Sequence, residues 1–211
     1  IIVVNDNQMS IAENHGGLYE NLAELRRSHG NCENNLFRAM GLDYVYVDKG
    51  NDLSSLIEAF RKVKDTNHPV VVHINTLKGK GYAPAEEDKE TWHWTMPFEI
   101  STGALKQKNI GEDYNSLTAA HLLQRMKDDK TVCAITAGTP GIWGWTPARR
   151  QEAGKQFVDV GIAEEHAVAL ASGMAKAGGK PVFGVCSSFL QRAYDQVSQD
   201  LCINDNPATL L

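Results

Sequence analysis

Short hydrophobic runs alternate with amphipathic stretches along the first half of the chain. The runs are rich in valine and isoleucine, as in strands buried on both faces of a parallel sheet, and they lie at residues 1–4, 44–47 and 69–74. The amphipathic stretches carry leucine and alanine at three- and four-residue spacing, which predicts helices at 17–28, 32–41 and 52–64. Asp52 suits the N-cap of the last helix. This alternation predicts a doubly wound sheet.

The same alternation returns in the second half. Strands are predicted at 131–136, 157–162 and 181–185, and helices at 114–128, 163–176 and 188–203. Between the halves, the glycines and prolines of residues 78–112 indicate a functional loop followed by a linker. We therefore expect an α/β fold of two incomplete doubly wound parallel sheets, in segments 1–95 and 113–211, with a linker at 96–112.

Composition narrows the class of protein. The net charge of −5 disfavours a nucleic-acid partner, and no apolar stretch reaches the length of about 18 residues that a membrane span needs. The four cysteines are scattered without a Cys-x-x-Cys pair, which predicts reduced thiols in a cytoplasmic protein, most simply in the bacterial cytosol. Both ends of the chain are hydrophobic runs, so we expect a strand cut at each end of an internal fragment.

Candidate chemistry lies after three of the predicted strands, where open α/β sheets bind their ligands. The first candidate is the segment from Asn5 to Ile11, NDNQMSI. Its side-chain amides and backbone carbonyls are the oxygen ligands that Mg²⁺ prefers beside a diphosphate. The same residue types also form ordinary turns, and that alternative stays open.

The second candidate is the loop at residues 78–84, KGKGYAP. Its glycines permit close approach of the backbone to a ligand and its lysines suit phosphate, although a solvated loop has the same composition. His93, between two tryptophans, is a candidate acid or base, and the alternative is a packed histidine.

The third candidate is the pair Glu164 and Glu165 at a strand end where a helix begins. Acidic residues are favoured in the first turn of any helix, which explains Glu165 more readily than Glu164.

Four segments in this order resemble the 1-deoxy-D-xylulose-5-phosphate synthase family. They are NDNQMSI at 5–11, KGKGYAPAEEDKETWH at 78–93, DVGIAEEHAVALASGMA at 159–175 and SSFLQRAYDQVSQD at 187–200. The resemblance extends over nearly the whole chain. It implies that 1–95 is the C-terminal part of a diphosphate-binding domain and that 113–211 is the N-terminal part of a pyrimidine-binding domain.

The resemblance implies a transferase that uses thiamine diphosphate and Mg²⁺. Such an enzyme joins pyruvate to D-glyceraldehyde 3-phosphate with loss of CO₂, and its product feeds isoprenoid, thiamine and pyridoxal synthesis. The cofactor supplies most of the chemistry while the protein supplies orientation and electrostatics. Members of the family are homodimers, so a homodimer is expected.

The family's residue roles carry over to matching positions. Asn7 resembles a metal ligand, and Met9 would add its backbone carbonyl. Glu164 resembles the glutamate that hydrogen-bonds the aminopyrimidine ring and promotes proton transfer there. The remaining matches are a pyrimidine-stacking aromatic, a cofactor-contacting tyrosine, a substrate-side histidine and a phosphate-binding arginine: Phe189, Tyr82, His93 and Arg192.

Some positions depart from the family's pattern. Glu165 stands where glutamine is usual, and Cys186 stands where a phosphate-binding tyrosine is usual. The stretch from Asn14 to Gly41 is shorter than expected, and this chain lacks the Gly-Asp-Gly motif with the family's aspartate ligand for Mg²⁺. We therefore expect the 211-residue chain alone to be inactive.

The sequence also allows two other functions. Another enzyme of the class that uses thiamine diphosphate, such as a transketolase or a 2-oxoacid dehydrogenase component, would share the fold and Glu164. A non-catalytic module that retained only the fold would explain the missing motif, but packing alone does not require Asn7, Glu164, Phe189 and Arg192 together.

Overall fold

The computed structural model describes residues 1–107 and 111–211. The chain divides into two compact units, Ile1–Lys108 and Asn109–Leu211. Each unit is an α/β layer built on a parallel sheet, as the sequence predicts. Within the described residues, no helix combines the length and the apolar character needed to cross a membrane.

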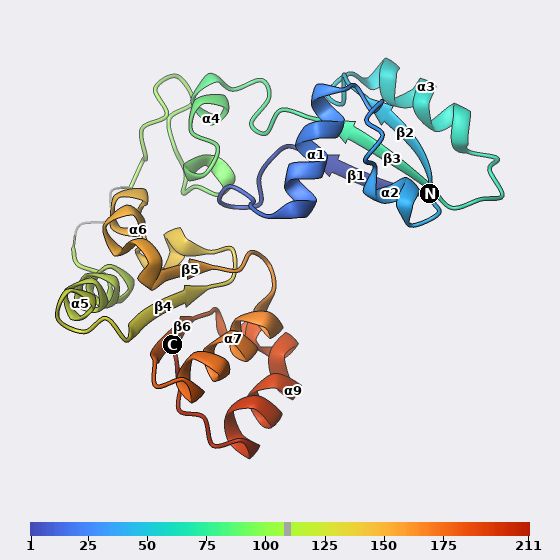
Figure 1. Cartoon of the computed structure of the whole chain (residues 1–211). Helices are drawn as coiled ribbons and strands as arrows, with labels where there is room; N and C mark the ends of the chain where they lie inside the picture. The colour runs from blue at the N-terminus through green and yellow to red at the C-terminus, as the bar shows by residue number, and fades with distance from the viewer. Residues whose placement is uncertain (108–110) are drawn as a thin grey trace. The chain divides into compact units, whose positions relative to one another are not determined.

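The first unit is built on a three-stranded parallel sheet in the order β1-β3-β2 (Figure 1). The strands are β1 (Ile2–Asp6), β2 (Asp43–Val47) and β3 (Val70–Asn75). The central strand β3 is buried throughout except at its last residue, which explains why it is apolar apart from His73 and Asn75. In register, His73 of β3 lies beside Val4 of β1 and Tyr46 of β2.

Helices cover both faces of this sheet because successive side chains of β3 point to opposite faces. Val70, Val72 and Ile74 pack with α3 (Leu53–Val63). Val71 packs on the other face with residues of α1 (Gly17–Arg27) and α2 (Leu36–Ala39). The first sheet is therefore doubly wound, and Asp52 caps α3 through a bond from the Ser55 amide, as expected.

Two parts of the first unit differ from the sequence prediction. The helix expected at 32–41 is only α2, because the Asn35 side chain caps the Phe37 and Arg38 amides and Gly41 has a φ of 79°. The loop expected after β3 contains α4 (Ala83–Glu87) and the 3₁₀ turn η1 (Thr91–His93).

The second unit has a parallel sheet in the order β5-β4-β6-β7 (Figure 1). Its strands are β4 (Val132–Thr136), β5 (Phe157–Asp159), β6 (Lys180–Gly184) and β7 (Thr209–Leu210). Val132 and Ala134 pack with α5 (Tyr114–Asp128), whereas Ile135 packs with α7 (Glu164–Lys176). This sheet is also covered on both faces.

The connections of the second unit contain the other differences. Strand β5 stops at Asp159, earlier than predicted, because its carboxylate accepts the amides of Gly138 and Gly161 and Gly161 turns the chain at a φ of 73°. The segment between β4 and β5, for which the sequence predicts no helix, holds η2 (Pro140–Trp143), α6 (Pro147–Ala153) and η3 (Gly154–Gln156).

The single helix predicted at 188–203 is interrupted. It consists of short turns in sequence: α8 (Ser187–Leu190), η4 (Gln191–Ala193), α9 (Tyr194–Gln196) and the π-helix η5 (Val197–Ile203). Mixed turns of this kind re-aim side chains within a helical path, and π turns are frequent at functional sites.

Candidate functional site

The first two candidate segments meet at the carboxyl end of the first sheet. Asp6 at the end of β1 pairs in register with Asn75 at the end of β3. The Thr76 amide donates to the Asp6 carbonyl at 3.0 Å, and the Thr76 hydroxyl donates to Asn5 Oδ1 at 2.6 Å. Residues far apart in the chain therefore form one loop cluster.

Lys78 ties this cluster together. Its ammonium donates to the Ser10 carbonyl at 2.6 Å, which joins the loop after β3 to the loop after β1. Burial lowers the pKa of Lys78, and the charge of Lys89 lowers it further while Glu90 opposes both. In this structure the lysine holds the loop and is not extended toward solvent.

Asn7 and Met9 form a tight turn at the end of β1. The Met9 amide donates to Asn7 Oδ1 at 3.0 Å, and Gln8 between them has a φ of 70°, in the left-handed region that few residues other than glycine adopt. The turn that the sequence allowed is present. An amide oxygen has two lone pairs, so one remains on Asn7 beyond this bond.

Tyr82 lies in an aromatic cluster with Trp92 and Phe98. Its ring centroid is 5.0 Å from that of Trp92 and 5.7 Å from that of Phe98. Its hydroxyl donates to the Ile100 carbonyl at 3.0 Å. Packing alone accounts for this side chain, whose predicted cofactor contact remains a prediction.

His93 is the last residue of η1 and its side chain is exposed, although neighbouring atoms desolvate part of the ring. Burial lowers the pKa of its imidazole, and the positive charge of Lys78 lowers it further. The ring is therefore held toward its neutral form, in which one nitrogen can accept a hydrogen bond or a proton.

In the second unit, Glu164 and Arg192 are brought together. Glu164 is the first residue of α7, and only 3% of its side chain is exposed. Its Oε2 accepts a hydrogen bond from Arg192 Nη1 at 3.1 Å, while 51% of the arginine side chain stays exposed. Glu165 is exposed, as expected of an ordinary first-turn acid.

Phe189 lies in α8, directly before the turn η4 that contains Arg192. It is 41% exposed, so its ring is accessible in this unit. Cys186 caps α8, since its carbonyl accepts the Phe189 amide at 2.8 Å. Among the described residues, the four cysteines are free thiols, as the sequence predicts.

The sequence interpretation missed a buried polar network behind the Asn7 turn. Asp6 is 5% exposed and His73 is fully buried, and the His73 Nε2 atom lies 2.8 Å from Asp6 Oδ2. Arg26 of α1 pairs with the same oxygen. The signal was a histidine inside the valine run of β3 together with an aspartate directly after β1.

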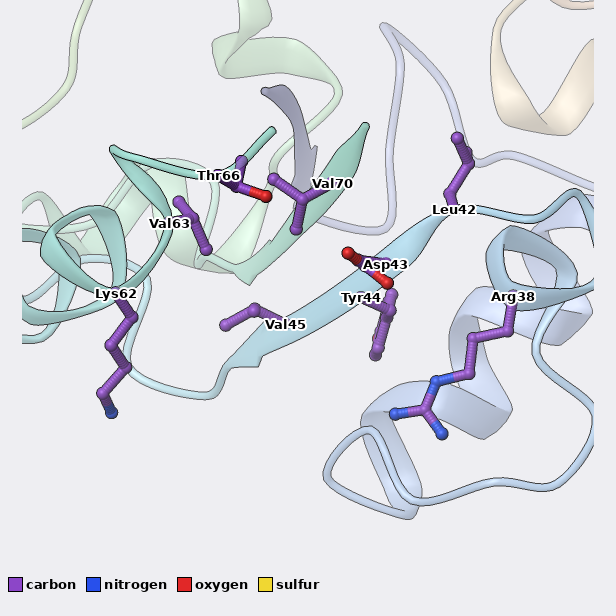
Figure 2. A pocket seen from close by; sticks show the side chains of 9 residues that line it. All are labelled: Arg38, Leu42, Asp43, Tyr44, Val45, Lys62, Val63, Thr66 and Val70. Atoms are coloured by element: carbon purple, nitrogen blue, oxygen red, sulfur yellow. The ribbon is translucent and has the colours of Figure 1, made fainter. Parts of the chain in front are cut away.

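A hollow of about 460 Å³ lies elsewhere in the first unit, near the amino ends of β2 and β3. Figure 2 shows Arg38 and Lys62 on opposite sides of β2, with Asp43 and Tyr44 between them. None of the predicted site residues lines it. It also lies at the opposite strand ends from those where open α/β sheets bind their ligands.

Comparison with known proteins identifies the class of chain. Residues 113–211 match the family model of the transketolase pyrimidine-binding domain, and residues 26–76 match that of 1-deoxy-D-xylulose-5-phosphate synthase. The matches define a transketolase-like chain. A transketolase from Leishmania mexicana aligns with 99% of this chain and 41% of its own at a TM-score of 0.40 and 13% identity, too distant to bear on function.

The curated relatives are more specific. 1-deoxy-D-xylulose-5-phosphate synthase 1 of Geobacter metallireducens is 37% identical across 99% of this chain, and the Clostridium perfringens enzyme of that name is 38% identical across 100%. The chain belongs to the 1-deoxy-D-xylulose-5-phosphate synthase family. It covers 39% of the length of each of these relatives, and the 246 residues aligned with the first include some that this chain lacks.

Proposed function

We propose that this chain contributes two parts of a thiamine-diphosphate site in a 1-deoxy-D-xylulose-5-phosphate synthase. The first unit supplies the diphosphate-binding part and the second the pyrimidine-binding part. The observation that carries the proposal is the burial of Glu164 at the first residue of α7, with Arg192 as its partner. Burying an ionised carboxylate costs free energy of folding, so a buried glutamate is a candidate for a functional residue.

Glu164 is proposed to hydrogen-bond the aminopyrimidine ring and to exchange a proton with it. Its position at the start of α7 fixes the carboxyl group on rigid backbone, and its burial excludes water from the exchange. The exposed ring of Phe189 is available for stacking on the same heterocycle. When bound, thiamine diphosphate supplies the carbon nucleophile of the reaction.

The loop after β1 is proposed to bind Mg²⁺. Asn7 offers an amide oxygen and Met9 a backbone carbonyl, which are the hard oxygen ligands that suit Mg²⁺ beside a diphosphate. The described residues contain no cluster of three histidine, cysteine, aspartate or glutamate side chains that would hold a metal without such help. The remaining ligands would come from the diphosphate, from water or from residues beyond these two.

Pyruvate and D-glyceraldehyde 3-phosphate are the proposed substrates, with loss of CO₂. Arg192, half exposed, is assigned to the phosphate of the aldehyde, because guanidinium binds phosphate in a bidentate manner. His93 is assigned to the substrate side as a neutral hydrogen-bonding group. Tyr82 is assigned to the cofactor. A cytoplasmic homodimer is the proposed state of the whole protein.

The test is product formation by the full-length protein from pyruvate and D-glyceraldehyde 3-phosphate, with and without thiamine diphosphate and Mg²⁺. We expect turnover that requires both additions. Glu164→Ala should lower kcat at least about a hundredfold, as is typical of losing a proton-transfer group. Glu165→Ala, an exposed acid on the same helical turn, should retain wild-type turnover. Turnover by Glu164→Ala at the wild-type rate would contradict the proposal.

A further inference from the structure

A carboxylate that the proposed function does not use lies directly behind the Asn7 turn. Asp6 ends β1 and is 5% exposed. Its Oδ2 accepts from Arg26 of α1 and lies 2.8 Å from His73 Nε2 of β3. Its Oδ1 accepts the Gln8 amide at 3.2 Å. One side chain therefore connects a helix, a strand and the loop.

The histidine of this network has partners on both sides. His73 is fully buried, and its Nδ1 lies 2.7 Å from the Tyr44 hydroxyl on β2. A neutral ring that accepts from Tyr44 and donates from Nε2 to Asp6 satisfies both bonds. Burial works to raise the pKa of Asp6, but the bonds from His73 and Arg26 outweigh it and leave that pKa lowered. The contacts with Arg26, His73 and the Gln8 amide fix the carboxylate in place.

A buried ionic network is weak support for stability, since well-packed apolar residues often serve the fold as well. What the network adds here is a backbone conformation. Gln8 has a φ of 70°, which costs free energy for a residue with a side chain. Two bonds hold it there: Asp6 Oδ1 accepts the Gln8 amide, and Asn7 Oδ1 accepts the Met9 amide.

We propose that Asp6 is a positioning residue, which holds Gln8 in its left-handed conformation and thereby orients Asn7 and Met9 as cation ligands. The proposal rests on the proposed function, in which those two residues bind Mg²⁺. Asp6 itself is not assigned as a ligand, because one of its oxygens faces Arg26 and His73 and the other faces the Gln8 amide.

Replacement by asparagine tests this role with little change of shape. A carboxylate accepts on both oxygens, whereas an asparagine amide accepts on one and donates on the other. In Asp6→Asn, the amide oxygen can face Arg26 or the Gln8 amide, but not both. Arg26 and His73 both face one oxygen of Asp6, whereas only the Gln8 amide faces the other, so the amide oxygen is favoured on the side of Arg26 and His73. The amide nitrogen then faces the Gln8 amide, and the turn at Gln8 loses its bond.

In the experiment, Mg²⁺ is titrated into the full-length protein at saturating thiamine diphosphate, and calorimetry measures its affinity. Thermal unfolding of the same proteins without metal measures their stability. Asp6→Asn should weaken Mg²⁺ binding about 10- to 100-fold, the usual effect of losing a group that orients a metal ligand. The control is Asp52→Asn, since Asp52 also accepts a backbone amide but caps α3. It should leave the Mg²⁺ affinity unchanged.

A second variant separates positioning from folding. Glycine adopts a positive φ at no steric cost, so Gln8→Gly in the Asp6→Asn background should recover much of the Mg²⁺ affinity without restoring the melting temperature. Wild-type Mg²⁺ affinity in Asp6→Asn, or a double variant no better than the single one, would overturn the inference while the proposed function stands. A wild-type protein that binds no Mg²⁺ would overturn both.

Discussion

At the residue scale, the chemistry depends on which polar side chains are buried and what partners they have. Asp6 ends strand β1 and Glu164 begins helix α7, and both acids are buried with an arginine partner. The sequence singled out Glu164 because it stands in a recognisable motif. The role of Asp6 could not be predicted from the sequence. Its partners, Arg26 and His73, lie 20 and 67 residues away along the chain, and only the fold brings them together.

The pair of Arg192 and Glu164 leads to a prediction on stability and substrate binding. Arg192→Ala leaves Glu164 buried without its partner, so the free energy of unfolding should fall by about 1–3 kcal/mol. The same change should raise the KM for D-glyceraldehyde 3-phosphate while leaving the KM for pyruvate nearly unchanged. Chemical denaturation and steady-state kinetics measure the two effects. An unchanged KM for the aldehyde would remove Arg192 from the phosphate site.

At the element scale, hydrophobic periodicity predicted the strands and the longer helices well. Strand β3 and helix α5 are long and strongly patterned, and their bounds agree with the prediction to within a residue or so. The misses are short or mixed elements. Helix α4 has too few residues to show a periodic pattern. The segment after Cys186 changes from α-helical to π-helical turns, so its residues do not keep the period of 3.6 on which the prediction relied.

The loop that packs on α4 depends on one glycine. Gly79 has a φ of 83°, and an added Cβ would lie 2.5 Å from the Ala85 carbonyl oxygen. Gly79→Ala should therefore lower the free energy of unfolding by about 2–3 kcal/mol in urea denaturation. Gly81 has a φ of 99° but open space around it, so Gly81→Ala should cost only about 1 kcal/mol. Equal losses would show that the contact with Ala85 is unimportant.

The junction between α5 and β4 gives a prediction about pH. Asp129 accepts a hydrogen bond from Lys180 at 2.7 Å and two from Thr131, and the lysine is the main cause of its lowered pKa. A lowered carboxyl pKa adds stability above the ordinary value of 3.8 and loses it as the pH falls toward the folded value. Asp129→Asn should thus be less stable than wild type at pH 7, and the gap should narrow below pH 3.8, as followed by thermal melts. A gap independent of pH would contradict this.

At the scale of the whole molecule, each unit has its own core, and the first sheet exposes apolar residues along one edge. β1 is an edge strand of the first sheet, with a side unpaired within the described residues, and Ile1, Ile2 and Val3 are each about half exposed. Incomplete parallel sheets, which the sequence predicts, leave edge strands unpaired. The sequence does not show which strand lies at the edge, because strand order depends on long-range pairing.

This edge predicts self-association of the 211-residue chain. Unpaired, apolar edge strands pair with other copies, and lysine on an edge opposes that pairing. Val3→Lys should therefore reduce the apparent mass of the concentrated chain in sedimentation or light scattering. Lys64→Glu changes charge on an exposed residue away from the edge and should have little effect. Equal association in Val3→Lys would mean that the β1 edge is not responsible.

The central claim is that Glu164 forms part of a thiamine-diphosphate site. Its most direct test is calorimetric titration of thiamine diphosphate into the full-length protein with Mg²⁺, comparing wild type, Glu164→Ala and Glu165→Ala. We expect saturable binding by wild type and by Glu165→Ala, and binding weakened at least about tenfold in Glu164→Ala, as for loss of a hydrogen bond to a charged group. Equal affinity for all three proteins, or no binding by wild type, would contradict the central claim.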